Sequence, residues 1–187
     1  MKAAMLLATL VAGGCSDPGG LGDATPWKAL DYDQFVCTVQ PTLIRRCSYL
    51  ACHGNADHAL RVFSIGKLRI TEPLTRAERS ETLLTADEVD ANWRSASALA
   101  ASGPADARAA GDPAGVVLLS KPLASDFGGS EHQGLAIFPA WPAGTLGDDA
   151  EWKALVAWVG GAKQPSPHTA DCTTLFANMQ LTPRSGP

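Results

Sequence analysis

The chain of 187 residues lacks the features that mark several large classes of protein. Beyond its N-terminal segment it has no run of roughly 20 apolar residues, the length that a helix needs to span a bilayer. Its 15 lysines and arginines are outnumbered by 19 acidic residues, so it has no electrostatic footprint for nucleic acid. No internal repeat is present. These absences argue against a helical membrane protein, a nucleic-acid binder and a repeat protein.

Signatures of common enzyme classes are missing as well. No Ser-His-Asp order, no phosphate-binding loop of the Walker type and no pair of catalytic carboxylates stands out. The acidic pairs Asp87-Glu88 and Asp148-Asp149 stand at predicted helix starts, where the helix dipole favours negative charge. The length suits one domain with a modest core. We therefore expect a single domain that is not an enzyme.

The N-terminal residues 1–14 are typical of a secretory signal. Lys2 provides a positive start, an apolar run rich in Ala and Leu extends from Ala3 to Ala12, and two glycines precede Cys15. Small residues before a cysteine resemble a lipobox, so we expect lipidation of the Cys15 thiol and anchoring in the cell envelope, periplasmic or at the outer surface. An ordinary cleaved signal is the alternative. The mature chain would carry 14 basic and 19 acidic residues, a net charge of -5.

The remaining chain divides into three parts by composition. Residues 15–26 are rich in Gly, Asp and Pro, which predicts a flexible tether. The folded domain is expected at 27–163, and 164–187 form a C-terminal tail. Within the domain, Leu60 to Ile70 follows no regular pattern and allows a pair of short strands.

Helix signals dominate the domain and predict a mainly α fold with irregular loops. Asp31 is followed by Gln34 at the offset of a helix cap, and Pro41 should kink or restart that helix. Two further helices are expected. The first would be capped by Thr85 with Glu88, and its apolar face would consist of Val89, Trp93, Ala96 and Ala100. The second would begin at Asp148 with Glu151 and end at Gly160-Gly161, and its apolar face would consist of Trp152, Leu155, Val156 and Val159.

The chemistry of the chain concentrates in the heptapeptide Cys47-Ser-Tyr-Leu-Ala-Cys52-His53. Covalent haem attachment needs two thiols that add to the porphyrin vinyl groups and an imidazole close behind them. Its usual motif is C-x-x-C-H. With four residues between the thiols, two must bulge outward for both sulfurs to reach the porphyrin. His53 is the informative residue, because a disulfide would have no use for it.

At these residues the chain resembles the c-type cytochromes, and in particular small planctomycete-type cytochrome c domains. The resemblance is carried by V-x-P-x-L at 39–43, by the C-x4-C-H-G motif from Cys47 to Gly54, by KPLASDFGGSEHQGLAIF from Lys121 to Phe138, and by AWVGGA from Ala157 to Ala162. It covers most of 31–163. The resemblance implies a mainly helical domain, one covalent haem c and electron transfer with a redox partner protein in the periplasm.

The resemblance also implies the iron ligands. His53 would be the proximal ligand. His132 is the first choice for the sixth position, since it lies in the GGSEHQG segment, and Met179 is the alternative, whose thioether would raise the reduction potential. His58 and His168 are weaker candidates.

Other roles for the cysteines stay open. Haem attachment would leave Cys37 and Cys172, whose bridge would staple the tail to the first helix and stabilise the fold by closing a long loop in the unfolded chain. Without haem, Cys47 and Cys52 would form a second disulfide, and the chain would be a surface lipoprotein that binds a protein or glycan. A zinc site is a third alternative, with the ligands Cys47, Cys52, His53 and His58.

Overall fold

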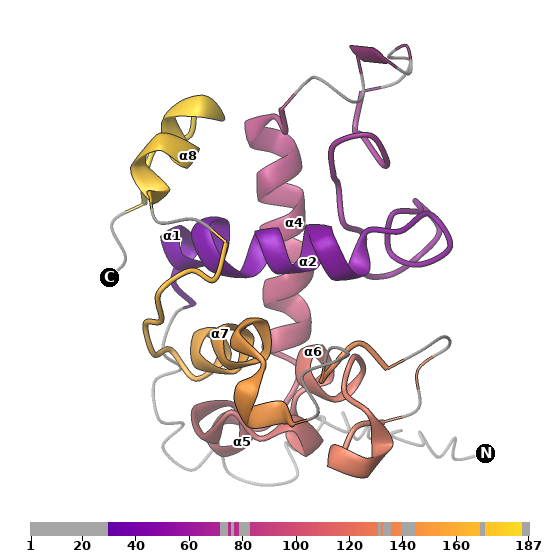
Figure 1. Ribbon diagram of the computed structural model, residues 1–187, viewed down its shortest axis with the longest axis vertical. Helices are drawn as coiled ribbons and strands as arrows, with labels where there is room; N and C mark the ends of the chain where they lie inside the picture. Colours follow the sequence, from indigo (N-terminus) through magenta and orange to yellow (C-terminus); the bar gives the residue numbers. More distant parts are fainter. Residues whose placement is uncertain are drawn as a thin grey trace, which may run out of the picture.

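A computed structural model describes residues 30–71, 75, 77–78, 83–130, 132, 136–139, 145–168 and 171–184. These residues form helices and loops without a strand, and an isolated bridge joins Leu123 to Phe138 (Figure 1). The predicted mainly helical class is confirmed. No helix within the described ranges has the length and apolar character needed to cross a bilayer. The elements are α1 (Tyr32–Gln34), η1 (Phe35–Val39), α2 (Gln40–Cys47), α4 (Ala86–Ala100), α5 (Ala105–Ala110), η2 (Pro113–Gly115), α6 (Val117–Ser120), η3 (Ser125–Phe127), η4 (Leu146–Asp148), α7 (Ala150–Val159) and α8 (Cys172–Asn178).

The first three elements, α1, η1 and α2, form one continuous helix. Asp31 caps its start, since its carboxylate accepts a hydrogen bond from the Gln34 N–H at 2.9 Å. The sequence predicts a kink or a restart of the helix at Pro41, and the α-helix α2 does begin there, at Gln40, with Pro41 in its first turn. The five residues before α2 form a π-helix, in which the Gln40 N–H donates to the Phe35 carbonyl. This widened turn lies where the proline ring would meet an α-helical backbone, so the helix passes Pro41 and reaches Cys47.

Two later helices begin and end close to their predicted residues. The capping box of α4 is complete, with Thr85 and Glu88 each bonded to the other's backbone N–H. The cap of α7 is one residue later than expected, because the Asp149 carboxylate, rather than that of Asp148, accepts from the backbone. Gly161 follows α7 in the left-handed region with φ at 69°.

Aromatic side chains join the first helix to α4 and α7. The ring centres of Tyr32 and Phe35 lie 5.3 and 5.4 Å from that of Trp93, and Trp158 lies 5.7 Å from Trp93. Phe35 and Trp158 are fully buried. In Figure 1 the first helix crosses α4, while α5, α6 and α7 cover one side of this crossing. The cluster therefore fixes the helix that ends at Cys47.

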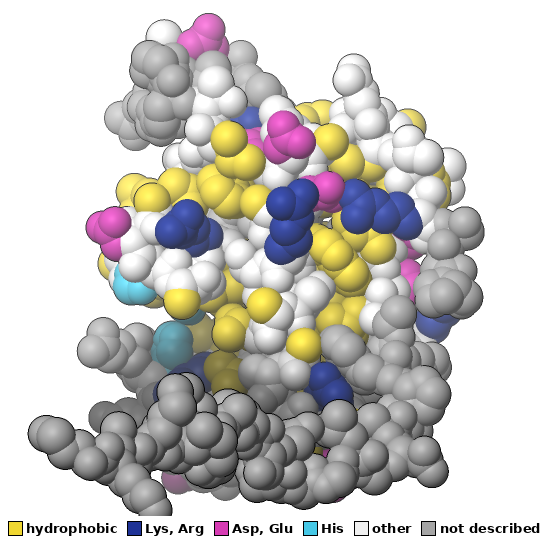
Figure 2. Space-filling view, turned by 180° about the vertical axis from the view of Figure 1, so that it is seen from behind, with side chains coloured by type: hydrophobic (Ala, Val, Ile, Leu, Met, Phe, Trp, Pro, Cys, Tyr) yellow, Lys and Arg dark blue, Asp and Glu magenta, His cyan; other side chains and the backbone are white. Residues whose placement is uncertain are grey.

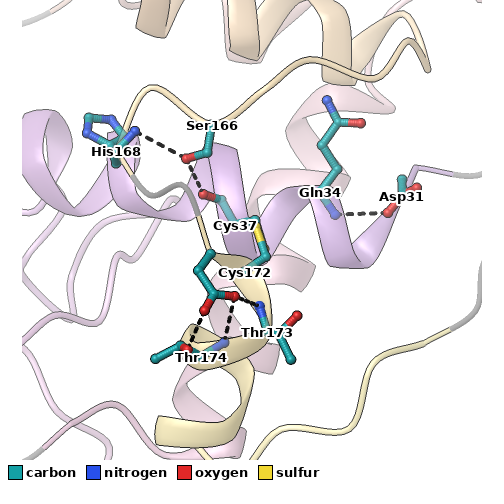
Figure 3. Close-up of a disulfide and its surroundings, with 9 residues drawn as sticks. Asp31, Gln34, Cys37, Ser166, His168, Cys172, Thr173 and Thr174 are labelled. Atoms are coloured by element: carbon teal, nitrogen blue, oxygen red, sulfur yellow. Dashed lines mark hydrogen bonds between the residues drawn. A yellow bond between two sulfur atoms is a disulfide. The ribbon is translucent and has the colours of Figure 1, made fainter.

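The C-terminal segment is part of this packing. A disulfide links Cys37 in η1 to Cys172 at the start of α8, with the Cα atoms 5.5 Å apart, so the predicted bridge is present. Beside it the Ser166 hydroxyl donates to the Cys37 carbonyl at 2.6 Å (Figure 3). In an α-helix this carbonyl would accept from the N–H of residue 41, which proline lacks. Phe176 and Met179 are buried in the core.

The segment from Leu60 to Ile70 contains no strand, so the short strand pair is not formed. Its backbone is bonded to a side chain instead: Asn92 of α4 accepts from the Phe63 N–H at 2.7 Å and donates to the Phe63 carbonyl at 3.0 Å. The Ser64 N–H donates to Leu68 across a turn. An asparagine thus takes the place that a neighbouring strand would have.

Candidate functional site

The C-x4-C-H segment folds back onto the end of α2. The His53 N–H donates to the Cys47 carbonyl at 3.0 Å, and the N–H groups of Cys52 and Gly54 both donate to the Tyr49 carbonyl. Gly54 lies so close to the backbone that a Cβ there would be 2.1 Å from the Ser48 oxygen, so only glycine fits. The turn brings both cysteines and His53 to one end of the first helix.

The residues added between the two cysteines point outward. Tyr49 is 57% exposed and Leu50 63% exposed, the highest exposed fractions among the large hydrophobic side chains of the described residues. Lys67 holds this loop, since its ammonium lies 4.2 Å from the centre of the Tyr49 ring and donates to the Ser48 hydroxyl at 2.9 Å. These two of the four residues between the cysteines are thus exposed at the surface.

The His53 ring is oriented by the backbone. Its Nδ1 lies 2.9 Å from the Leu60 carbonyl oxygen. A carbonyl only accepts, so Nδ1 must carry the proton, and in the neutral ring Nε2 then keeps its lone pair. Burial, and after it the proximity of His132 and His58, lowers the pKa of His53. The ring is therefore prepared as a neutral ligand, and a second partner on the other nitrogen is the usual arrangement for a metal-binding histidine.

The cysteines and His53 line an apolar cavity of about 280 Å³. Its walls come from several elements: α2, the segment after His53, α6, the loop near Phe138, and α7. Apolar lining residues are Leu43, Leu60, Leu118, Ile137, Phe138 and Leu155. Histidines reach the surface at the left edge of Figure 2, with some hydrophobic side chains beside them. Such a cavity suits a largely apolar group of fixed shape.

The two thiols of the cavity are free. Cys47 is buried and Cys52 partly exposed, and no disulfide joins them. Burial, together with the nearby Cys52, raises the pKa of Cys47 to about 12, so its thiol is protonated at neutral pH. Within the part of the chain that is described, no three or more His, Cys, Asp or Glu side chains gather as ligands of a metal ion. The alternative of a zinc site with the ligands Cys47, Cys52, His53 and His58, all of them described residues, is therefore not formed.

His132 faces His53 in the same cavity. The centres of the two rings lie 5.9 Å apart, with an angle of 39° between their planes. The Nδ1 atom of His132 is buried and has no hydrogen-bond partner. A buried polar atom without a partner is costly, so this one points to a ligand or to an interaction that forms on binding. The two residues that the sequence singled out thus meet across one cavity.

The other ligand candidates lie in different places. His58 lines the cavity, 5.8 Å from the His53 ring. Met179 does not line it but is buried in the core at the end of α8. The disulfide at Cys37 holds α8 near the start of the first helix, and ten residues of an α-helix from there to Cys47 span roughly 15 Å. His168 is engaged elsewhere, with its Nε2 atom 2.8 Å from the Glu151 carboxylate.

Charged residues at the cavity wall were not evident from the sequence. Arg46 and Lys121 line the cavity. The buried carboxylate of Glu151 accepts from Arg46 Nε at 2.6 Å and from Arg45 Nε at 2.8 Å. Arg46 stands between Arg45 and Cys47 in the sequence, and nothing there pairs it with a residue of α7, about a hundred positions later. Only the packing of α7 on the first helix brings them together.

The contacts that hold the His53 ring in place could not be predicted from the sequence for the same reason. The Leu60 carbonyl that orients the ring belongs to a segment held by the Val62 N–H, which donates to the His53 carbonyl at 2.7 Å. Asn92 then fixes the next residue, Phe63. A backbone carbonyl leaves no signal in the sequence, whereas an asparagine within a predicted amphipathic helix was a signal that could have been noted.

Comparison with protein-family models, with curated proteins and with solved structures gave no match to this chain. The arrangement of the site therefore rests on its own residues. It combines two free thiols, one oriented imidazole, a second imidazole opposite and apolar walls. Thiols can form covalent links and imidazoles can donate a nitrogen lone pair, so both kinds of bond are chemically open to a group held in this cavity.

Proposed function

We propose that the chain is a c-type cytochrome, an electron carrier that holds one covalent haem c in this cavity and is tethered to the cell envelope through Cys15. One observation carries the proposal: His53 donates from Nδ1 to the Leu60 carbonyl and keeps Nε2 for a metal, beside two free thiols on the same cavity wall. A disulfide-stapled binding module would need neither the free thiols nor the oriented ring.

The residues of the cavity fit such a group. Cys47 and Cys52 would form the two thioether links, His53 would be the proximal ligand, and His132, whose buried Nδ1 has no partner, would bind on the other side. When bound, haem supplies an iron that changes by one electron. Two imidazoles give a lower reduction potential than an imidazole and a thioether, because axial ligand identity is a main determinant of potential.

The chain itself would perform the remaining tasks. Leu43, Leu118 and Phe138 exclude water from the cavity. Arg46 and Lys121 bring positive charge to its wall, where carboxylates of the bound group would be favoured. With His53 and His132 holding it, the bound group would supply one-electron transfer with a redox partner protein, while the chain's own residues would hold, orient and shield it.

The test is covalent haem. The full chain is expressed in a bacterial host with cytochrome c maturation machinery, separated by denaturing electrophoresis and stained for haem. We expect a stained band whose mass exceeds that of the apoprotein by one haem. The double variant Cys47→Ser/Cys52→Ser should lose the stain, and Cys37→Ser/Cys172→Ser, which removes the other pair of cysteines, should keep it. An unstained wild-type band with a Cys47–Cys52 disulfide would overturn the proposal.

The envelope location is tested separately, since Cys15 lies outside the described residues. Radioactive palmitate should label the wild-type chain, and the labelled protein should co-sediment with membranes. Cys15→Ala should abolish both the label and the sedimentation while the haem stain persists. A labelled Cys15→Ala variant, or an unlabelled wild type, would contradict the lipid anchor and leave the haem proposal standing.

A further inference from the structure

Three imidazoles, and not two, meet in the cavity. The centre of the His53 ring lies 5.9 Å from that of His132 and 5.8 Å from that of His58. Both of these rings line the same cavity. By distance alone, His58 and His132 are equivalent partners for His53.

These separations are close to what a shared metal ion requires. With metal–nitrogen bonds of about 2.0 Å and about 1.2 Å from a ring nitrogen to the ring centre, two imidazoles on opposite sides of one ion have centres about 6.4 Å apart. Both separations fall within about 0.6 Å of this value. Only one of His58 and His132 can bind opposite His53 at a time, so the role of the other ring has to be explained.

The surroundings distinguish the two rings. His132 has a buried Nδ1 atom without a partner, so leaving it unligated is costly. His58 is exposed, and water satisfies its nitrogens when it binds nothing. His132 should therefore be the resident ligand, and His58 the one that stands aside.

The two rings also reach the cavity by independent routes. His58 belongs to the loop between His53 and Leu60, which the hydrogen bond from His53 Nδ1 to the Leu60 oxygen closes. Its distance from His53 is thus set locally. His132 belongs to the region after η3, whose backbone is bonded to α6 through the Ser130 N–H and the Ser120 carbonyl. A displacement of His132 would leave His58 in place.

We infer that His58 is a reserve axial ligand, which binds the iron on the side opposite His53 when His132 is withdrawn. This inference rests on the proposed function. The site then has two six-coordinate states that differ only in which histidine completes them. Because His58 is exposed and His132 half-buried, the exchange would change how far solvent reaches the site, and with it the reduction potential, while leaving no position open to small molecules.

The experiment uses the haem-loaded full chain and three variants, His58→Ala, His132→Ala and the double variant. The visible spectrum reports the spin state, and carbon monoxide binding to the reduced protein reports an open position. We expect wild type and His58→Ala to share one low-spin spectrum. His132→Ala should stay low-spin with a shifted midpoint potential. The double variant should be high-spin and bind carbon monoxide at least tenfold faster than either single variant.

Controls separate ligation from folding. His168→Ala removes a histidine that does not line the cavity and should leave the spectrum unchanged. Added imidazole should return the double variant to the low-spin form if its fold is intact, and circular dichroism should match that of wild type.

Three results would overturn the inference. A high-spin His132→Ala variant would show that His58 does not reach the iron, and a high-spin His58→Ala variant would make His58 the resident ligand. A double variant that stays low-spin would show that another side chain, such as Lys121, completes the site. In all three cases the haem stain remains and the proposed function stands, whereas the absence of covalent haem from every variant would overturn both.

Discussion

At the scale of single residues, the two cysteines of the cavity differ in their surroundings. Cys47 is buried at the end of α2, and burial raises its pKa to about 12, while Cys52 is partly exposed. The thiolate is the reactive form of cysteine, so a buried protonated thiol reacts slowly.

In haem-free protein kept reduced, iodoacetamide should alkylate Cys52 well before Cys47 at pH 8. Mass spectrometry of peptides at timed intervals measures both rates in the same sample. Unfolding the protein in urea should bring the two rates together, which serves as the control. Equal rates in the folded protein would contradict the burial of Cys47.

Glu151 is the residue on which the acid stability of the site should depend. Burial alone would raise its pKa, yet the pKa lies below 4.5, because Arg45 and Arg46 hydrogen-bond to the carboxylate and hold opposite charge. A carboxyl whose pKa is lower in the folded state stabilises the fold above its unfolded pKa and loses this contribution as pH falls through the folded value.

Glu151→Gln should lower the free energy of unfolding at pH 7 by about 3 kcal/mol, the low end for a broken buried ion pair, because solvent can reach Arg45. Below pH 4.5 the difference from wild type should shrink, since wild type loses the same interaction there. Urea unfolding at pH 7, 5 and 3.5 measures this. Glu78→Gln, at an exposed position, is the control, and a difference that grows toward low pH would contradict the assignment.

Residue identities in the site could be predicted in part. Cys47, Cys52, His53 and His132, which a motif and a resemblance singled out, line one cavity, and their binding of haem stays a prediction. The distance of Met179 from that cavity could not be foreseen, because it depends on how the bridge places α8. The role of the Leu60 carbonyl could not be predicted from the sequence either, because every residue has a backbone carbonyl.

At the scale of elements, α4 supports the site through Asn92. Its buried side chain makes two hydrogen bonds to the backbone of Phe63, three residues after the carbonyl that orients His53. Through Phe63, this helix therefore supports the segment whose Leu60 carbonyl orients the His53 ring.

Asn92→Ala should lower the free energy of unfolding by about 2 to 3 kcal/mol, since it leaves a buried N–H and a buried carbonyl without partners. Hydrogen exchange of the Phe63 amide should become faster. The matched control is Asn55→Ala, because Asn55 also accepts a backbone N–H, but in an exposed loop. Unchanged protection of Phe63 in the Asn92 variant would show that the segment is held by other contacts.

Elements with strong local signals were predicted well. The caps at Asp31 and Thr85 each lie where sequence spacing placed them, because a cap is a contact between residues three apart. The prediction that 60–70 could form a strand pair is wrong, since the backbone there bonds to Asn92 and not to a second strand. The short α8 carried no signal because its two threonines have low helix propensity and the bridge holds it in place.

At the scale of the whole molecule, the bridge between Cys37 and Cys172 closes a loop across 135 positions, nearly all of the described chain. The entropy that the unfolded chain loses through such a loop corresponds to about 5 kcal/mol in the chain-entropy model. The bridge thus fastens the tail against the first helix, together with Phe176 and Met179 in the core.

The double variant Cys37→Ser/Cys172→Ser should therefore unfold at a lower temperature than wild type and lose up to about 5 kcal/mol of stability. Thermal unfolding with and without a reductant measures it. The reductant should destabilise wild type toward the level of the variant and leave the variant unchanged. If wild type is insensitive to a reductant that demonstrably opens the bridge, packing alone holds α8.

The position of this bridge has a consequence for export, which we propose for this chain. An exported chain emerges from its N-terminus, so Cys37 would reach the oxidising compartment together with Cys47 and Cys52, and its partner Cys172 would follow 135 residues later. The first thiols that Cys37 meets would thus be the wrong ones. Rapid oxidation would trap Cys37 on the two cysteines that we propose to carry haem, and a host with active disulfide isomerase should then yield more haem-stained protein than one without it.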